Sequence, residues 1–210
     1  MRRLVLAAAL AAWSFPAHAA WKEFTYTDLG IAKFFPAEPK VSKGTYGEDI
    51  RLPLSKVVPT TIVAAEDGGV TYKMTIADFK GRETEGANIM GEAFSRLAGR
   101  GTVVSQGFPR LDLGANSVYG LVLIVDEKGG DHATSEVFFN KGKLYIIQAI
   151  APQNSQARFD SGIGRFMETV RFHLQGYGFD EKLGHDFPIG DNDPNDRDLG
   201  YNRPAPPKKN

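Results

Sequence analysis

The stretch KLYIIQAIA, residues 143–151, decides the fold that we predict for this chain. Apolar side chains occupy nearly every position, whereas a strand with one wet face alternates apolar and polar residues. The run LVLIV at residues 121–125 has the same character. Runs of this kind are typical of central strands covered on both faces, so we expect a β-sheet with a layer of helix over it.

Two more strands are predicted before this stretch. They span residues 117–126 and 133–141, with Gly129-Gly130 in their connection. Asn140-Lys141-Gly142 then makes a tight hairpin turn into residues 143–151. The three segments therefore predict consecutive antiparallel strands.

A separate hairpin is predicted upstream, where Asp67-Gly68-Gly69 joins residues 60–66 to residues 70–79. The second segment, VTYKMTIADF, alternates apolar and polar residues, which predicts one buried face and one wet face. The residues expected on the buried face are Val70, Tyr72, Met74 and Ile76.

The chain after residue 20 also begins with a predicted hairpin. WKEFTYT (21–27) and IAKFF (31–35) flank the turn Asp28-Leu29-Gly30, and Pro36 ends the second strand because proline cannot donate to a ladder. The following run IRLPLSKVVP (50–59) contains two prolines, so we expect it at a sheet edge or in irregular structure.

Two main helices are predicted to flank the sheet. The first lies between about Thr84 and Arg100, and the second follows Pro152 with Asn154 or Ser155 as its N-cap. The first apolar stripe consists of Ala87, Met90, Ala93, Phe94 and Leu97. The second consists of Phe159, Ile163, Phe166, Met167 and Val170.

A short strand, RFHL (171–174), is predicted after the second helix. The predicted core combines residues of the strands with residues of both helices. The side chains expected to be mostly buried are Tyr72, Met74, Phe94, Leu97, Leu123, Ile146, Phe159, Phe166 and Met167.

Both ends of the chain lie outside this predicted domain. A basic start, an apolar run and the small-x-small pattern Ala17-His18-Ala19 predict a signal peptide at residues 1–19, and hence a periplasmic or secreted protein. Residues 20–176 are predicted to form a single α+β domain. Residues 177–210 are rich in Gly, Pro, Asn and Asp, so we expect an extended or disordered tail. The tail residues that could contact the domain are Phe179, Leu183 and Phe187.

The composition excludes several classes of protein. The chain has no cysteine, which excludes disulfides, thiol catalysis and Cys-ligated zinc. Without Arg2 and Arg3 of the signal, 23 of the 25 Lys and Arg remain against 25 Asp and Glu, so no nucleic acid partner is indicated. No stretch after the signal approaches the roughly 20 apolar residues of a membrane span.

No catalytic, cofactor-binding or metal-binding residue is predicted. His132 and Glu136 stand at i and i+4, but these positions lie about 13 Å apart in a strand, so we expect a solvated hairpin histidine. Asp191, Asp193 and Asn195 alternate like the ligands of a calcium loop. Because the required Gly and bidentate Glu are missing there, a solvated acidic tail is the preferred interpretation and calcium binding the alternative.

The order of these elements resembles a known group of proteins. FFPAEPKV (34–41) and the closing RFMETVRF (165–172) are similar to motifs of bacterial exported domains of unknown function. Those domains in turn resemble the PsbP-like α/β sandwich, a fold of an extrinsic photosystem II subunit and of a Ran-binding nuclear import factor. The resemblance covers about residues 24–174. It implies an antiparallel sheet flanked by two main helices, and it supplies no functional residues.

These observations predict a non-enzymatic periplasmic binding or assembly module. Its partner would be an unknown envelope protein or a small ligand. The alternative is a small hydrolase that uses scattered Asp, Glu and His residues. A carboxylate or histidine with a strongly shifted pKa in a closed cleft would favour the enzyme, whereas a shallow surface would favour the binding module.

Overall fold

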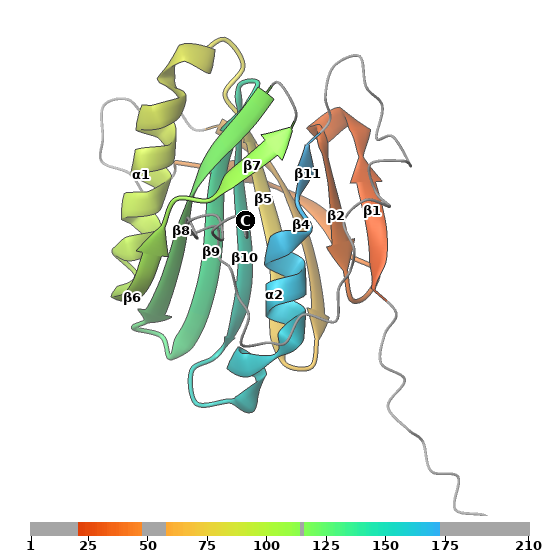
Figure 1. The fold of residues 1–210 in the computed structure, drawn as a ribbon, viewed down its shortest axis with the longest axis vertical. Helices are drawn as coiled ribbons and strands as arrows, with labels where there is room; N and C mark the ends of the chain where they lie inside the picture. The colour runs from red at the N-terminus through yellow and green to blue at the C-terminus, as the bar shows by residue number, and fades with distance from the viewer. Residues whose placement is uncertain (1–20, 48–57, 114–115, 173–210) are drawn as a thin grey trace, which may run out of the picture.

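The strands predicted from the apolar runs lie together in one large antiparallel sheet (Figure 1). The computed structural model describes residues 21–47, 58–113 and 116–172. The strand order is β3-β4-β5-β10-β9-β8-β6, and β7 also pairs with β8. The bounds are β3 Lys40–Tyr46, β4 Val58–Asp67, β5 Val70–Asp78, β6 Gly101–Gly107, β7 Arg110–Leu113, β8 Asn116–Glu127, β9 Asp131–Asn140 and β10 Lys143–Pro152. The predicted α+β class is confirmed.

The N-terminal hairpin belongs to a second, smaller sheet, which the sequence analysis did not predict. β1 (Lys22–Tyr26) pairs with β2 (Ile31–Phe35), and β2 pairs with the short strand β11 (Arg171–Phe172). The hairpin itself is confirmed: Gly30 at its corner has φ 74°, a left-handed conformation that glycine adopts without strain.

The first predicted helix is confirmed, but its buried face is rotated relative to the predicted apolar stripe. α1 spans Gly86–Ala98 after a 3₁₀ turn at Glu83–Glu85. Ala87 is exposed and Phe94 is only partly buried, which corrects the predicted stripe. Ala93 and Leu97 of the predicted stripe are buried, and Gly86 and Ile89 complete the buried face of the helix.

The second helix starts later than predicted. Ser155 caps a 3₁₀ turn at Gln156–Phe159, and Asp160 caps α2 (Ser161–Glu168) by accepting a hydrogen bond from the Gly162 N–H. Asp160 has extended backbone angles, which break the helical period. Phe159 is therefore out of phase with the stripe and 64% exposed, so its predicted burial was wrong. The other predicted core residues are buried, apart from Phe94.

Strand β10 faces two separate hydrophobic clusters, as its continuous apolar run predicted. Tyr145 and Ile147 join the cluster of α2 and the small sheet. Leu144 and Ile146 point the other way and join the cluster of α1. We call these two sides of the large sheet the α2 face and the α1 face, and Figure 1 shows α2 lying over β10 and β5.

The structure corrects two further expectations about strands. The edge strands β3, β6 and β7 were not predicted, and Pro59 lies inside β4, where it is paired with Thr45; residues 50–57 lie outside the described ranges. The predicted wet face of β5 is half-buried, because β4 and β10 flank the strand on both sides. No helix in the described ranges has the length and apolarity that crossing a membrane requires.

Candidate functional site

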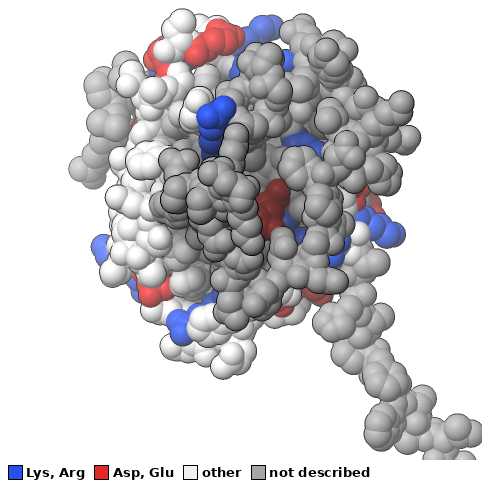
Figure 2. Space-filling view, viewed as in Figure 1, with Lys and Arg blue, Asp and Glu red and all other residues white. Residues whose placement is uncertain are grey.

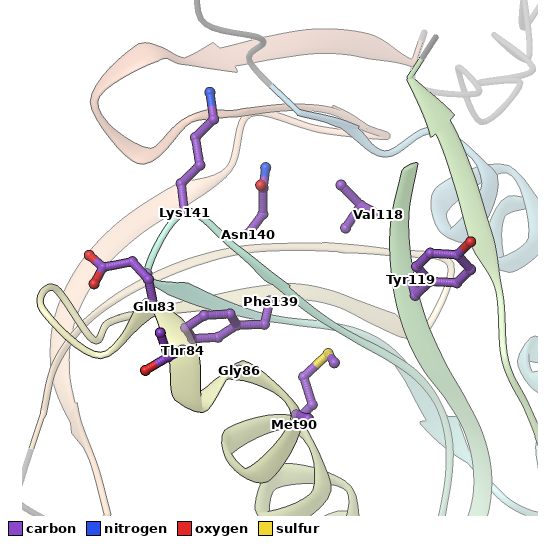
Figure 3. A pocket seen from close by; sticks show the side chains of 11 residues that line it. Glu83, Thr84, Gly86, Met90, Val118, Tyr119, Phe139, Asn140 and Lys141 are labelled. Atoms are coloured by element: carbon purple, nitrogen blue, oxygen red, sulfur yellow. The ribbon is translucent and has the colours of Figure 1, made fainter. Parts of the chain in front are cut away.

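A depression of about 390 Å³ lies where α1 begins, and it opens broadly to solvent (Figure 3). Its wall combines the start of α1, the first half of β8 and the turn between β9 and β10. The ring of Phe139 packs so closely against the helix that a Cβ atom at Gly86 would lie 2.5 Å from it. The lining residues are Glu83, Thr84, Gly86, Ala87, Met90, Val118, Tyr119, Phe139, Asn140, Lys141 and Gly142.

The depression presents apolar and charged groups, and its chemistry suits binding. Phe139 and Met90 supply apolar surface, and Glu83 and Lys141 lie together at one side (Figure 3). A hydrogen bond from the Gly81 backbone N–H lowers the pKa of Glu83, so this carboxylate stays ionised at neutral pH and is poorly suited to general acid–base work. The arrangement can hold an apolar ligand or side chain beside polar groups.

An exposed apolar surface adjoins this depression. Four of the six large hydrophobic side chains that are exposed in the described ranges lie between β6 and β8. We call them the β6 patch: Val103 (42% exposed), Val104 (55%), Phe108 (81%) and Tyr119 (61%). Tyr119 belongs to both the patch and the depression.

The backbone holds the parts of the β6 patch together. Gly120 donates its N–H to the carbonyl of Pro109 over 2.9 Å, and Arg110 of β7 is paired with Tyr119 of β8. These bonds place Pro109 and Arg110 beside Gly120 and Tyr119, and the guanidinium of Arg110 lies 5.6 Å from the centre of the Tyr119 ring. Figure 2 shows a largely uncharged surface on the left side of the molecule, where Figure 1 places β6.

A cluster of ionisable groups lies inside the molecule, on the α2 face. Lys33 stands in the inward row of β2 between Ile31 and Phe35 and is fully buried. Its ammonium donates a hydrogen bond to the carbonyl of Phe166 and lies 4.5 Å from the centre of that ring. Burial lowers the pKa of Lys33 to about 7, against the opposing influence of Glu136.

Glu136 of β9 is the second member of this cluster. Burial raises its pKa to about 7, while the positive charge of Lys33 acts in the opposite direction. Its Oε2 atom is buried and has no hydrogen-bond partner. Glu168 at the end of α2 also acts on both groups, so the cluster links β2, β9 and α2.

The structure separates the two residues that the sequence placed together in HATSE. His132 is half-buried, and its Nδ1 lies 2.7 Å from Oδ1 of Asp126 on the neighbouring strand, so the predicted solvated histidine was wrong. Glu136 instead belongs to the Lys33 cluster. Within the described part of the chain, no three His, Cys, Asp or Glu residues are grouped as a metal site. His173, Asp191, Asp193 and Asn195 lie outside the described residues.

Sequence reasoning missed both the β6 patch and the buried cluster. A signal for the cluster was present, because strand periodicity places Lys33 between two inward apolar residues of IAKFF. For β6 the only signal was the uncharged run GTVVSQGF after the first helix.

No family model and no curated protein matches this sequence. Among solved structures, the chain is similar to cyanobacterial PsbP (CyanoP) from Synechocystis sp. PCC 6803, determined in solution. The sequence identity is 14%, the match covers 78% of this chain and 99% of that chain, and the TM-score is 0.45.

Proposed function

We propose that this chain is a non-enzymatic binding or assembly module of the periplasm. In this proposal residues 1–19 are the signal peptide, residues 20–176 form a PsbP-like α/β/α sandwich, and residues 177–210 are a tail outside the domain. The partner is an envelope protein or a small ligand that contacts the β6 patch and the adjoining depression.

The observation that carries this proposal is the row of exposed apolar side chains along the β6 edge of the large sheet, Val103, Val104 and Phe108. Single exposed hydrophobic residues are ordinary, but several of them along one uncharged sheet edge are a candidate interaction surface. Phe108 and Tyr119 are aromatic, and aromatic side chains are enriched in interfaces because they bury large areas at little entropic cost. A shallow surface of this kind suits binding better than catalysis.

The alternative, a small hydrolase, is favoured by one observation. Lys33 and Glu136 both have pKa values of about 7, where a group can take up and release protons. Neither residue lines the depression, however, and the ammonium of Lys33 is already engaged with Phe166. The cluster is therefore better explained as an internal link between β2, β9 and α2.

The test is capture from envelope extract by the chain from residue 20 onward. Phe108→Ser removes the most exposed aromatic residue of the β6 patch. Phe159→Ser is the matched control, because Phe159 is exposed to 64% and lies before α2, outside the patch. We expect the wild type and Phe159→Ser to recover the same partner, and Phe108→Ser to lose it. Recovery that depends equally on both residues would contradict the proposed surface.

A second measurement separates the two functions. Purified chain is assayed with ester and peptide hydrolase substrates, alongside Glu136→Gln. Turnover by the wild type that is lost in Glu136→Gln, at a temperature where circular dichroism shows the variant to be folded, would support the hydrolase and contradict the binding module.

A further inference from the structure

We infer that β6 is a self-association edge, on which a second copy of this chain adds its own β6 in antiparallel orientation. The inference rests on the proposed function, because it names a partner for the β6 patch. In the described part of the chain β6 pairs with β8 alone and ends the strand order of the large sheet. The edge of a sheet presents backbone N–H and C=O groups that another strand can pair with.

The two edges of this sheet differ in whether charged side chains protect them from pairing with another strand. β3, at the opposite edge, carries Lys40 and Lys43 within seven residues. Lysines on an edge strand discourage pairing, because a second strand would bring further charges against them. β6 has the sequence GTVVSQG, without a charged residue, and Thr102 to Gln106 are all exposed. Of the two edges, only β6 lacks charged side chains.

Charge also selects a second copy as the occupant. In a two-fold symmetric interface a residue on the symmetry axis meets its own copy, so a charge at the centre of the strand meets its own like charge. Two copies of β6 meet without such repulsion, whereas two copies of β3 would bring Lys43, at the centre of that strand, opposite its own copy. The whole chain carries 25 basic and 25 acidic residues, so long-range repulsion between copies is weak.

The two ends of β6 complement each other in antiparallel pairing. Arg100 precedes the strand, and its side chain is 47% exposed although it pairs with Glu127 over 3.3 Å. Phe108 follows the strand and is 81% exposed. Antiparallel pairing brings the start of one strand to the end of the other, so Arg100 of each copy lies near Phe108 of the second. A guanidinium over an aromatic ring is a favourable contact.

An irregularity in β6 limits the strength of this association. The register with β8 shifts between Val103 and Ser105, and such a bulge increases local twist and interrupts a ladder. The added ladder is therefore short. We expect a reversible dimer that forms with rising concentration, at the weak end of specific interfaces.

The experiment measures the dimer dissociation constant by sedimentation equilibrium, using the chain from residue 20 onward. Val104 is the central residue of β6, so self-pairing places it close to its own copy, and Val104→Lys introduces mutual repulsion. Val41→Lys is the matched control, because Val41 is exposed to 56% on β3 and Val104 to 55% on β6. We expect Val104→Lys to weaken dimerisation by about tenfold or more and Val41→Lys to leave it unchanged.

Variants of opposite charge at position 104 distinguish a loss of dimerisation from misfolding. Val104→Glu alone should also weaken dimerisation, whereas an equal mixture of Val104→Lys and Val104→Glu should restore it, which unfolded chains would not do. A wild type that stays monomeric at high micromolar concentration would overturn the inference. So would a dimer that Val41→Lys weakens as much as Val104→Lys.

Failure of this inference is distinguishable from failure of the proposed function. If the wild type is monomeric but captures an envelope partner through Phe108, the binding module stands and only self-association is wrong. If the chain dimerises through β6 but Phe108→Ser captures the same proteins as the wild type, self-association stands and the external partner is wrong.

Discussion

The two faces of the large sheet are built from the same strands but are covered in different ways. The α1 face is closed by one helix over chiefly aliphatic residues such as Leu123, Val137 and Ile146. The α2 face is closed by a shorter helix together with a three-stranded sheet, and it contains the fully buried Lys33. Dispersion and area burial therefore dominate on the first face, whereas electrostatics also counts on the second.

Aromatic contacts connect the layers of the α2 face. The ring of Phe166 packs edge-to-face with Phe35 at 5.3 Å and with Tyr72 at 5.2 Å, and Phe172 packs with Tyr145 at 4.8 Å. These pairs join the small sheet, α2 and the large sheet. Such pairs contribute about 0.5–1.5 kcal/mol each beyond their buried area. The small sheet and α2 thus behave as one cover, which we expect to be lost as a unit.

The largest effect is expected from breaking the buried charge pair on the α2 face. Lys33→Met leaves Glu136 buried without a compensating charge, and Glu136→Leu does the same to Lys33. We expect each single variant to lose about 3–5 kcal/mol of unfolding free energy, and the double variant to be neutral or more stable by about 1–4 kcal/mol. Urea unfolding at pH 7 measures all three. A double variant as unstable as the two losses combined would show that the groups do not form a pair.

The pH dependence sharpens the same contrast. The pKa of Glu136 is raised to about 7 in the folded state, so its stabilising contribution is present below pH 4.5 and lost as the pH rises through 7. The pKa of Lys33 is lowered to about 7, so its contribution is present above pH 10.5 and lost as the pH falls through 7. We expect the double variant to exceed the wild type most near pH 7. A difference that stays constant from pH 4 to 10 would contradict these shifted pKa values.

On the α1 face the expected effect comes from lost packing alone. Leu123 of β8 is fully buried between β9 and β6, and Leu123→Ala should cost about 2–5 kcal/mol through lost transfer energy and the cavity left behind. The loss should be the same from pH 5 to 9, in contrast to the variants on the α2 face. A loss below about 1 kcal/mol would show that this face tolerates a cavity and that packing on the two faces is not equally tight.

The parts of the fold that the sequence predicts are those with a strong burial signal. β10 shows a continuous apolar run because its residues belong alternately to the two hydrophobic clusters. β5 alternates apolar and polar residues because Tyr72 and Met74 face the α2 side. The edge strands β3 and β6 are exposed along most of their length, so they leave neither pattern in the sequence. The proposed binding surface lies on one of these edges, and it was therefore invisible to periodicity.

The buried cluster was hidden for a different reason. Lys33 occupies an inward position of β2, but its partner Glu136 lies about a hundred residues further along the chain, on the other sheet. Local patterns cannot pair residues across two sheets. The same limit applies to the small sheet itself, because β2 lies near the start of the described chain and β11 at its end.

The smallest effect is expected from removing the C-terminal segment, which tests whether either face needs cover from it. Residues 177–210 lack a periodic apolar face, so a chain ending at Gly176 should unfold at nearly the same temperature as one ending at Asn210. The α2 face is the one on which contact with the C-terminal segment should be sought, because Val122 lies on the same face as Glu136 and is only half-buried. If Phe179, Leu183 and Phe187 docked there, truncation would cost several kcal/mol, at roughly 1.5–3 kcal/mol for each side chain. Melting both chains with and without Leu123→Ala separates the faces, since a tail bound to the α2 face would leave the cost of that substitution unchanged.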